Sequence, residues 1–394
     1  MPPSDVETVT RRAARRAALG AQHLVEPASS VEQALVHTAG VSGAIPSGPL
    51  SLAVRVEGFT PARLDRTLTA DRSVVRVPAM RGALYLLPTD LAADGLALAR
   101  PDQFRPALVR AGMEEEAYDG LAASVESLLD GTPRTGTEIR RELGSERVDR
   151  DLPKGTFVVF LRGLGHEGRI LRVGVRGGPQ SQAFEYATTE WWLGSPLRVP
   201  PVLDGLVRLL PLYLDAHGPA SLDDLAWWAG VTRKVARDAL ERFGPREVRL
   251  EGREEVLFAS ASEPARETPA QATEPTLLPH WDPYLTAHVD RSRYLPERWH
   301  DRVIDRGGNS TNTVLVDGEV AGVWDFSEGV LAYSAFEEAW DRHGLHVAAH
   351  AVVPVLGELP LVERGLSPSL SGRGQNAFRA PLRGVDDLNP GRVE

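Results

Sequence analysis

Apolar and polar residues follow two different periods within the first hundred residues. Helical spacing covers Val6–Leu24 and resumes after Ser30, whose hydroxyl suits a helix N-cap. Thr60 and the proline after it are typical of a third helix start, because threonine caps free N–H groups and proline fits the first turn. Over residues 73–77 and 83–87 the spacing of apolar residues instead becomes that of a β-strand, with a repeat of two residues. These patterns predict helices followed by a β-hairpin.

The same order of elements recurs in the second hundred residues. Residues 121–143 carry two stretches with helical spacing, and 155–164 carry a third. Residues 170–175 then read as a strand, and a glycine-rich turn leads to a second strand at 183–187. A second group of helices that ends in a hairpin is therefore expected.

The third repetition is the clearest of the three. Helical spacing covers 202–216, a second helix follows Ser221, and a third covers 232–243 after a turn at Gly230. A hairpin at 247–258 completes the group, with Glu-Gly at its turn. Three helices and a hairpin, with a short turn before the last helix, are typical of a winged helix-turn-helix. We therefore predict an α+β chain with three tandem winged-helix domains.

The remainder of the chain changes in composition. Residues 261–276 are rich in Pro, Glu, Ala and Thr, and such a segment buries too little apolar surface to order itself, so it is expected to be a linker. Thr313–Trp324 contains strand, Asp-Gly turn and strand, which predicts a β-rich C-terminal domain. The expected divisions are winged-helix domains at 6–110, 111–200 and 201–260, the linker, the β-rich domain at 277–366 and an irregular tail at 367–394.

Composition narrows the chemistry. The 394 residues include no cysteine, which excludes disulfides, thiolate metal sites and cysteine nucleophiles. The net charge of -10 argues against a protein that coats nucleic acid indiscriminately. No apolar run has the length of a signal peptide core or a membrane span, so we expect a cytoplasmic protein without membrane contact.

Local positive charge points to duplex DNA as the partner. Only two lysines are present, so arginines carry almost all of this charge, and they fall in groups. Arginines on a wing or on the second helix of a helix-turn-helix can contact phosphates and groove edges, although charged strands and helices are also ordinary solvated surfaces. The candidate DNA-binding residues are Arg76, Arg81, Arg162, Arg169, Arg172, Arg176, Arg233, Lys234 and Arg237.

Two further motifs do not support a cofactor. Gly163, Gly165 and Gly168 match the dinucleotide-binding spacing, but a strand pattern follows them where that fingerprint requires a helix. Three histidines in 343–350 have helical spacing, but Gly344 weakens the helix that a metal site would need. We expect no metal, no nucleotide cofactor and a monomer.

Four segments together resemble one known family. They are Leu50–Thr60, Ala79–Pro88, His280–Leu285 and Thr313–Trp324, and in order and spacing they are similar to the AlkZ-like (YcaQ-type) DNA glycosylases over about Val9–Gly357. The resemblance implies three tandem winged helices and a β-barrel-like C-terminal domain that form a clamp on DNA. It also implies removal of bulky alkylated or crosslinked purines by cleavage of the N-glycosidic bond.

The family's catalytic motif is altered at its expected position. Members carry a glutamine, an apolar residue and then glutamine or aspartate, and the polar pair holds the attacking water. Counting back from Leu50, this motif falls on Val41, Ser42 and Gly43. Valine and glycine cannot hold water, and Ser42, in the middle position, is expected to point away from DNA. His37 and Thr38 are the nearest polar substitutes, His37 is the weak candidate, and the catalytic residue stays unknown.

Three functions are therefore compatible with the sequence. The first is a duplex DNA-binding protein of this family that recognises or protects against bulky alkylation damage. The second is an active glycosylase with altered chemistry. The third is a winged-helix scaffold or protein-interaction module. The stretch 37–48 contains no acidic or amide side chain, which favours binding without cleavage.

Overall fold

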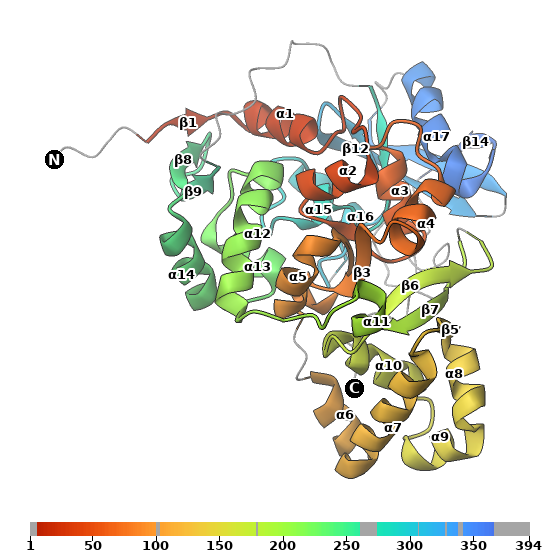
Figure 1. Ribbon diagram of the computed structural model, residues 1–394. Helices are drawn as coiled ribbons and strands as arrows, with labels where there is room; N and C mark the ends of the chain where they lie inside the picture. Colours follow the sequence, from red (N-terminus) through yellow and green to blue (C-terminus); the bar gives the residue numbers. More distant parts are fainter. Residues whose placement is uncertain are drawn as a thin grey trace.

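The computed structural model is a mixed α+β protein, shown in Figure 1. It describes residues 6–99, 103–178, 180–260, 274–305, 307–327, 329–337 and 342–365. Three small sheets of three strands and one sheet of five strands account for its strands within these ranges. None of the helices in the described part of the chain is both long and apolar enough to cross a membrane.

The first group of helices ends in a hairpin, as its periodicity predicts. The caps at Ser30 and Thr60 are present, each with its side chain accepting from the backbone N–H three residues on. The helices are α2 (Val31–His37), α3 (Ser47–Ala53), α4 (Pro61–Thr69) and α5 (Ala92–Ala97). The sheet order is β2 (Val41–Ser42), β4 (Leu84–Pro88), β3 (Val74–Pro78).

The second group adds short helices that the sequence pattern missed, namely α6, α9 and α11. Its helices are α6 (Phe104–Arg110), α7 (Glu115–Leu129), α8 (Gly136–Leu143), α9 (Ser145–Asp151), α10 (Phe157–His166) and α11 (Thr189–Leu193). The sheet order is β5 (Arg134–Thr135), β7 (Ala183–Thr188), β6 (Ile170–Arg176). Thr135 and Glu138 form a capping box at the start of α8, which fixes the turn between α7 and α8.

The third group matches its predicted elements closely. Ser221 and Thr232 cap the second and third helices, and Gly230 ends the second in a left-handed conformation. The elements are α12 (Val202–His217), α13 (Leu222–Ala229), α14 (Arg233–Phe243), β8 (Arg246–Leu250) and β9 (Val256–Ala259).

The predicted helix over Val6–Leu24 is shorter than expected. Residues 8–9 form a strand, β1 (Thr8–Val9), parallel to β8, and helix α1 (Arg11–Ala21) begins after the Thr10 cap. The edge of β8 takes up this strand from about 240 residues away in sequence, and helical periodicity carries no information on such pairing. Ala18 and Leu19 of α1 then pack against the C-terminal sheet.

The C-terminal sheet is open, so the barrel-like form that the resemblance implies is not observed. Its order within the described residues is β10 (Thr276–Leu278), β11 (Thr313–Val316), β12 (Glu319–Ser327), β13 (Val330–Ala335), β14 (Leu361–Glu363). A barrel requires the two edge strands to pair, and here β10 and β14 stay at opposite edges. The predicted Asp-Gly turn joins β11 to β12. Residues 261–273 of the predicted linker and the whole predicted tail at 367–394 lie outside the described residues.

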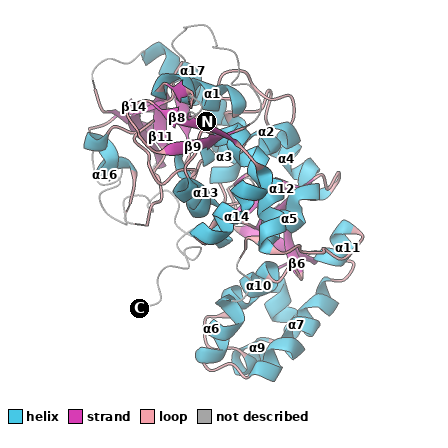
Figure 2. Ribbon diagram, turned by 90° about the vertical axis from the view of Figure 1, so that its left-hand side faces the viewer, coloured by secondary structure: helices cyan, strands magenta, loops and turns pink. Residues whose placement is uncertain are grey.

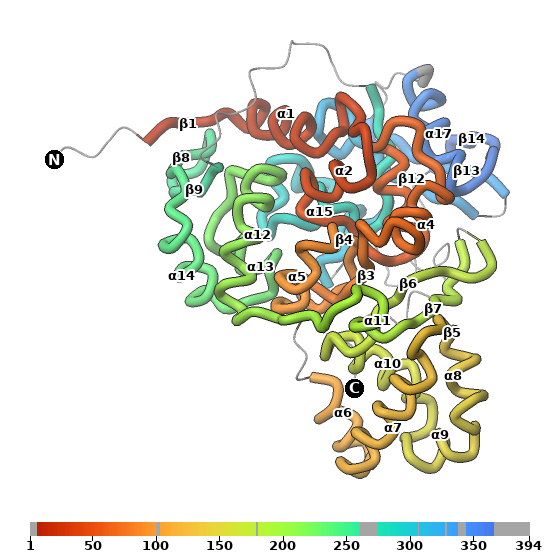
Figure 3. Tube along the Cα trace, viewed as in Figure 1, coloured from red at the N-terminus to blue at the C-terminus, as the bar shows by residue number. Residues whose placement is uncertain are grey.

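The hydrophobic cores cross the boundaries between these groups. Helices of the third group pack with strands β3 and β6 of the first and second groups. Helix α17 (Arg342–Leu356) packs with the first group and the five-stranded sheet. In Figures 2 and 3, helices α6 to α10 project from one end of the molecule, while the other elements form its main mass. Shared cores therefore hold the groups together.

Candidate nucleic-acid interface

A cavity of about 230 Å³ lies where the first group, the second group and the C-terminal part meet. Strands β3 and β4 with the turn between them supply one wall, and α10 and β6 supply another. Residues that follow β10 complete it. The polar, charged and aromatic lining side chains are Ser42, Arg76, Arg81, Tyr85, Phe104, Arg162, His166, Arg172, Tyr186, Trp281, Thr286 and Asn309.

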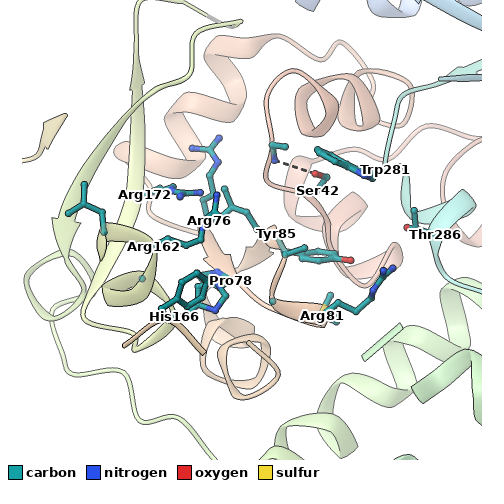
Figure 4. A pocket seen from close by; sticks show the side chains of 18 of the residues that line it. Ser42, Arg76, Pro78, Arg81, Tyr85, Arg162, His166, Arg172, Trp281 and Thr286 are labelled. Carbon is teal, nitrogen blue, oxygen red and sulfur yellow. Dashed lines mark hydrogen bonds between the residues drawn. The ribbon is translucent and has the colours of Figure 1, made fainter. Parts of the chain in front are cut away.

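The structure brings four of the nine predicted DNA-binding residues together at this cavity: Arg76, Arg81, Arg162 and Arg172. Figure 4 shows Arg76, Arg162 and Arg172 on one side and Arg81 on the other, with Tyr85 between them. Strands β3 and β6 lie in contact, which places arginines from two distant parts of the sequence next to each other.

Arg76 is the most unusual of these arginines. Its side chain is only 2% exposed, yet its Nε and Nη1 have no hydrogen-bond partner within the described part of the chain. The guanidinium lies 5.1 Å from the ring centroid of Phe184. Burial, together with the neighbouring charge of Arg172, lowers the pKa of Arg76 to about 9. A buried cation that forms no ion pair among the described residues is costly, which makes Arg76 a candidate for contact with an anion.

Arg172 faces the cavity because strand residues alternate between the two faces of a sheet. Its neighbours Leu171 and Val173 are buried in the core, while its guanidinium lies 5.1 Å from Phe184 and 5.9 Å from Tyr186. The guanidinium groups of Arg76 and Arg172 therefore both lie 5.1 Å from the ring centroid of Phe184. Aromatic faces attract guanidinium groups and help to hold them in place.

The opposite wall of the cavity includes Trp281, whose indole is held by a hydrogen bond. Trp281 has a left-handed backbone (φ 61°), and its Nε1 donates to Asn309 Oδ1 over 3.0 Å. Arg81 also has a positive φ of 58°, and its guanidinium lies 3.8 Å from the ring centroid of Trp227. Non-glycine residues in this conformation are strained and cluster at functional sites. Trp281 lies in the His280–Leu285 segment, which was noted for its resemblance but not as a site.

Two other lining residues were missed by the sequence analysis. His166 is buried, its Nδ1 lies 2.5 Å from the carbonyl of Ala99, and burial lowers its pKa to about 4. Burial also raises the pKa of the Tyr85 phenol. Both side chains are therefore uncharged at neutral pH. The sequence offers no signal for His166 beyond the glycine-rich stretch around it.

The expected catalytic position lies partly in the core and partly at the cavity. Val41 is fully buried in the core, whereas Ser42 lines the cavity. The reason is the pairing of β2 with β4, which sets Ser42 opposite the cavity residue Tyr85. Ser42 Oγ accepts from the Ala44 N–H over 3.3 Å. His37 lies outside the lining and stacks against His23.

The five remaining predicted DNA-binding residues lie outside the cavity lining, and four of them pair with carboxylates. Arg169 binds Glu126 with two bonds of 2.7 Å, and Arg176 binds Glu138 and Glu185. On α14, Lys234 pairs with Asp238 over 2.7 Å and Arg233 with Asp223 over 3.2 Å. The fifth residue, Arg237, is also on α14.

Comparisons with known proteins identify the family. The family model described as "DNA glycosylase AlkZ-like" matches residues 37–354. The chain belongs to the AlkZ-like DNA glycosylase family. Streptomyces sahachiroi DNA glycosylase AlkZ has a similar solved structure, with a TM-score of 0.71 and 22% identity, covering 91% of this chain and 99% of that one. At that identity the likeness shows the fold. No curated protein matches the chain.

Two of the segments that carry the AlkZ-like resemblance meet in the core. Arg55, after α3, donates from Nη1 and Nη2 to the carboxylate of Asp282 over 2.7 Å each, and Ser51 Oγ donates to the same carboxylate over 2.8 Å. The Asp282 side chain also caps α15 (Pro283–Thr286). Both charged side chains are fully buried. In this AlkZ-like protein the pair therefore fixes Trp281 relative to the first group.

Proposed function

We propose that this AlkZ-like protein binds duplex DNA and recognises or protects against bulky alkylation damage without rapid cleavage of the glycosidic bond. One observation carries the proposal. Four arginines line the cavity, and no carboxylate is among the described residues that line it. Such a site attracts phosphate oxygens strongly.

The motif position lacks the groups that would assist glycosidic cleavage. The sugar develops positive charge as the bond to the base breaks, as in oxocarbenium-like transition states. An enzyme lowers that barrier with groups placed to stabilise the charge and to hold water. At the motif position Ser42 alone lines the cavity, in place of the polar pair of the family motif, a glutamine followed by a glutamine or aspartate.

The fold supports contact with duplex DNA. We interpret the three groups of helices and hairpins as three winged helices, a fold that binds DNA through its helices and wings. The hairpins β3–β4 and β6–β7 each supply an arginine to the cavity, which is the arrangement expected of wings that contact phosphates. The protein acts as a monomer in this proposal.

Binding and base release measured on one alkylated duplex test the proposal. We expect binding that weakens with salt, because neutralised phosphates release counterions, and base release at the spontaneous rate. Fast release by the unmodified protein would show an active glycosylase instead. Absence of duplex binding would leave a protein-interaction role.

A further inference from the structure

Helix α13 of the third group reaches the cavity from outside its lining. Trp227 of α13 is not among the described residues that line the cavity, but its indole lies against three that are. The guanidinium of Arg81 lies 3.8 Å from its ring centroid, and its Nε1 donates to the carbonyl of Thr286 over 3.3 Å. A Cβ on Gly308 would come within 2.8 Å of the ring, so glycine leaves the room that the indole occupies. Trp227 therefore joins three parts of the lining.

A second arginine helps to hold this indole. The guanidinium of Arg291 lies 5.8 Å from the ring centroid of Trp227, and its Nη2 donates to the carbonyl of Gly308 over 3.0 Å. Aromatic faces attract guanidinium groups, so both arginines stabilise the ring where it is. The hydrogen bond, the glycine contact and the two cations together fix the orientation of Trp227.

The backbone of Arg81 is also in contact with α13. Arg81 lies in the turn Met80–Gly82 between β3 and β4, where its φ of 58° is left-handed. Gly230, which ends α13, has a φ of 72°, and a Cβ there would lie 2.7 Å from the Cα and 2.9 Å from the N of Arg81. A strained backbone persists only where its surroundings impose it. One helix therefore contacts both the backbone and the guanidinium of Arg81.

The next helix, α14, has no such connection with the cavity. A winged helix usually contacts DNA through its last helix, which in the third group is α14. Here Arg233 pairs with Asp223 and Lys234 with Asp238, and no residue of α14 is among the described residues that line the cavity. The third group therefore reaches the cavity through α13.

We propose that Trp227 is a positioning residue for DNA binding, which holds the guanidinium of Arg81 at the cavity for contact with a phosphate. This inference rests on the proposed function, because it assigns Arg81 to the DNA backbone. A long side chain that becomes ordered only on binding lowers affinity, whereas one already held by its neighbours avoids that cost. The third group thus contributes to binding through Arg81 and not through α14.

A double-mutant cycle on a duplex that carries N7-methylguanine tests the coupling between the two residues. Trp227→Leu should weaken binding roughly twofold to tenfold, which is the effect of freeing one long side chain. In the Arg81→Ala background the same substitution should change the dissociation constant by less than about 1.5-fold, since no guanidinium remains to be positioned. Trp227→Phe keeps an aromatic face beside Arg81 and should bind more tightly than Trp227→Leu.

Trp191 provides the matched control. It is also partly buried, and the guanidinium of Arg72 lies 5.5 Å from its ring centroid, but neither residue is among the described ones that line the cavity. Trp191→Leu should therefore leave duplex binding unchanged. Thermal melting shows whether each variant folds. If Trp227→Leu does not fold, Trp227→Met takes its place with the same expected coupling to Arg81.

The outcomes separate this inference from the proposed function. An equal loss in both backgrounds, or no loss on Trp227→Leu, overturns the positioning role and leaves salt-dependent duplex binding in place. An Arg81→Ala variant with the affinity and salt dependence of the unmodified protein also overturns it, because Arg81 then contacts no phosphate. Absence of duplex binding by the unmodified protein overturns the proposed function itself.

Discussion

At the residue scale, the packing around residues 41–43 accounts for the altered motif. Val41 is enclosed in the core, and a Cβ on Gly43 would come within 2.8 Å of Leu84 Cγ and 3.1 Å of Arg76 Cγ. Ser42 alone has its side chain on the cavity side. A glutamine pair at 41 and 43 has no room in this backbone, so the first group is fitted to small residues there.

Substitutions at this position test that packing. Gly43→Gln should lower the free energy of unfolding by about 1 to 3 kcal/mol, because overpacking forces neighbours to move. Ser42→Gln should stay within about 0.5 kcal/mol, since its side chain enters open space. Urea unfolding of both variants gives the comparison. Equal stability of Gly43→Gln and the unmodified protein would refute the steric explanation.

The sequence predicted some of the residues that line the cavity and also some that lie outside it. This difference has a physical cause. Arg76, Arg81, Arg162 and Arg172 were predicted from local charge, and they do line the cavity. Arg169 and Arg176 have the same local pattern, but carboxylates from other elements pair with them. Tertiary contacts decide which arginines are paired, so charge grouping in sequence cannot separate the two sets.

At the element scale, local signals explain the success of the helix and hairpin predictions. Ser30, Thr60, Ser221 and Thr232 cap their helices with their own side chains, and each such signal acts within three residues. Strand β1 and the open edge of the C-terminal sheet depend on partners far away in sequence. Local patterns therefore missed β1, and the barrel-like form that the resemblance implies is not observed in the described residues.

The buried pair Arg55–Asp282 joins two elements that no local signal connects. Asp282→Ala should cost about 3 to 5 kcal/mol, because it leaves a buried guanidinium uncompensated and removes the α15 cap. Asp301→Ala is the control, since its side chain is 88% exposed, and it should change stability by less than about 0.5 kcal/mol. Similar losses in both variants would argue against a structural role for the pair.

At the scale of the whole molecule, buried histidines lie where the groups meet. His217 accepts at Nδ1 from the side-chain amide of Gln22, the residue after α1, over 3.1 Å, and it donates from Nε2 to the Thr38 carbonyl over 3.2 Å. His288 lies against the His217 carbonyl at 3.0 Å. Burial lowers the pKa of His217 and of His280 to about 3. These side chains are therefore neutral in the folded protein.

Stability should consequently fall in acid. The folded-state pKa of His217 lies below the unfolded value of about 6.5, so the unfolded chain binds more protons between the two values. Full stability is present above about pH 6.5 and decreases towards pH 3, by about 1.4 kcal/mol per pH unit for each such histidine. Thermal melts from pH 4 to 8 measure the slope. His217→Gln should reduce it, and an unchanged slope in that variant would exclude His217 as a source.

The central claim is that this AlkZ-like protein holds damaged duplex through a cavity of arginines and does not hydrolyse it. The most direct measurement follows one duplex that carries N7-methylguanine, with protein in excess, by fluorescence anisotropy and by release of the base. The account predicts saturable binding that weakens with salt, a shallower salt dependence in Arg172→Ala than in Arg176→Ala, and base release at the background rate. Release well above background by the unmodified protein, lost in Ser42→Ala, would contradict it.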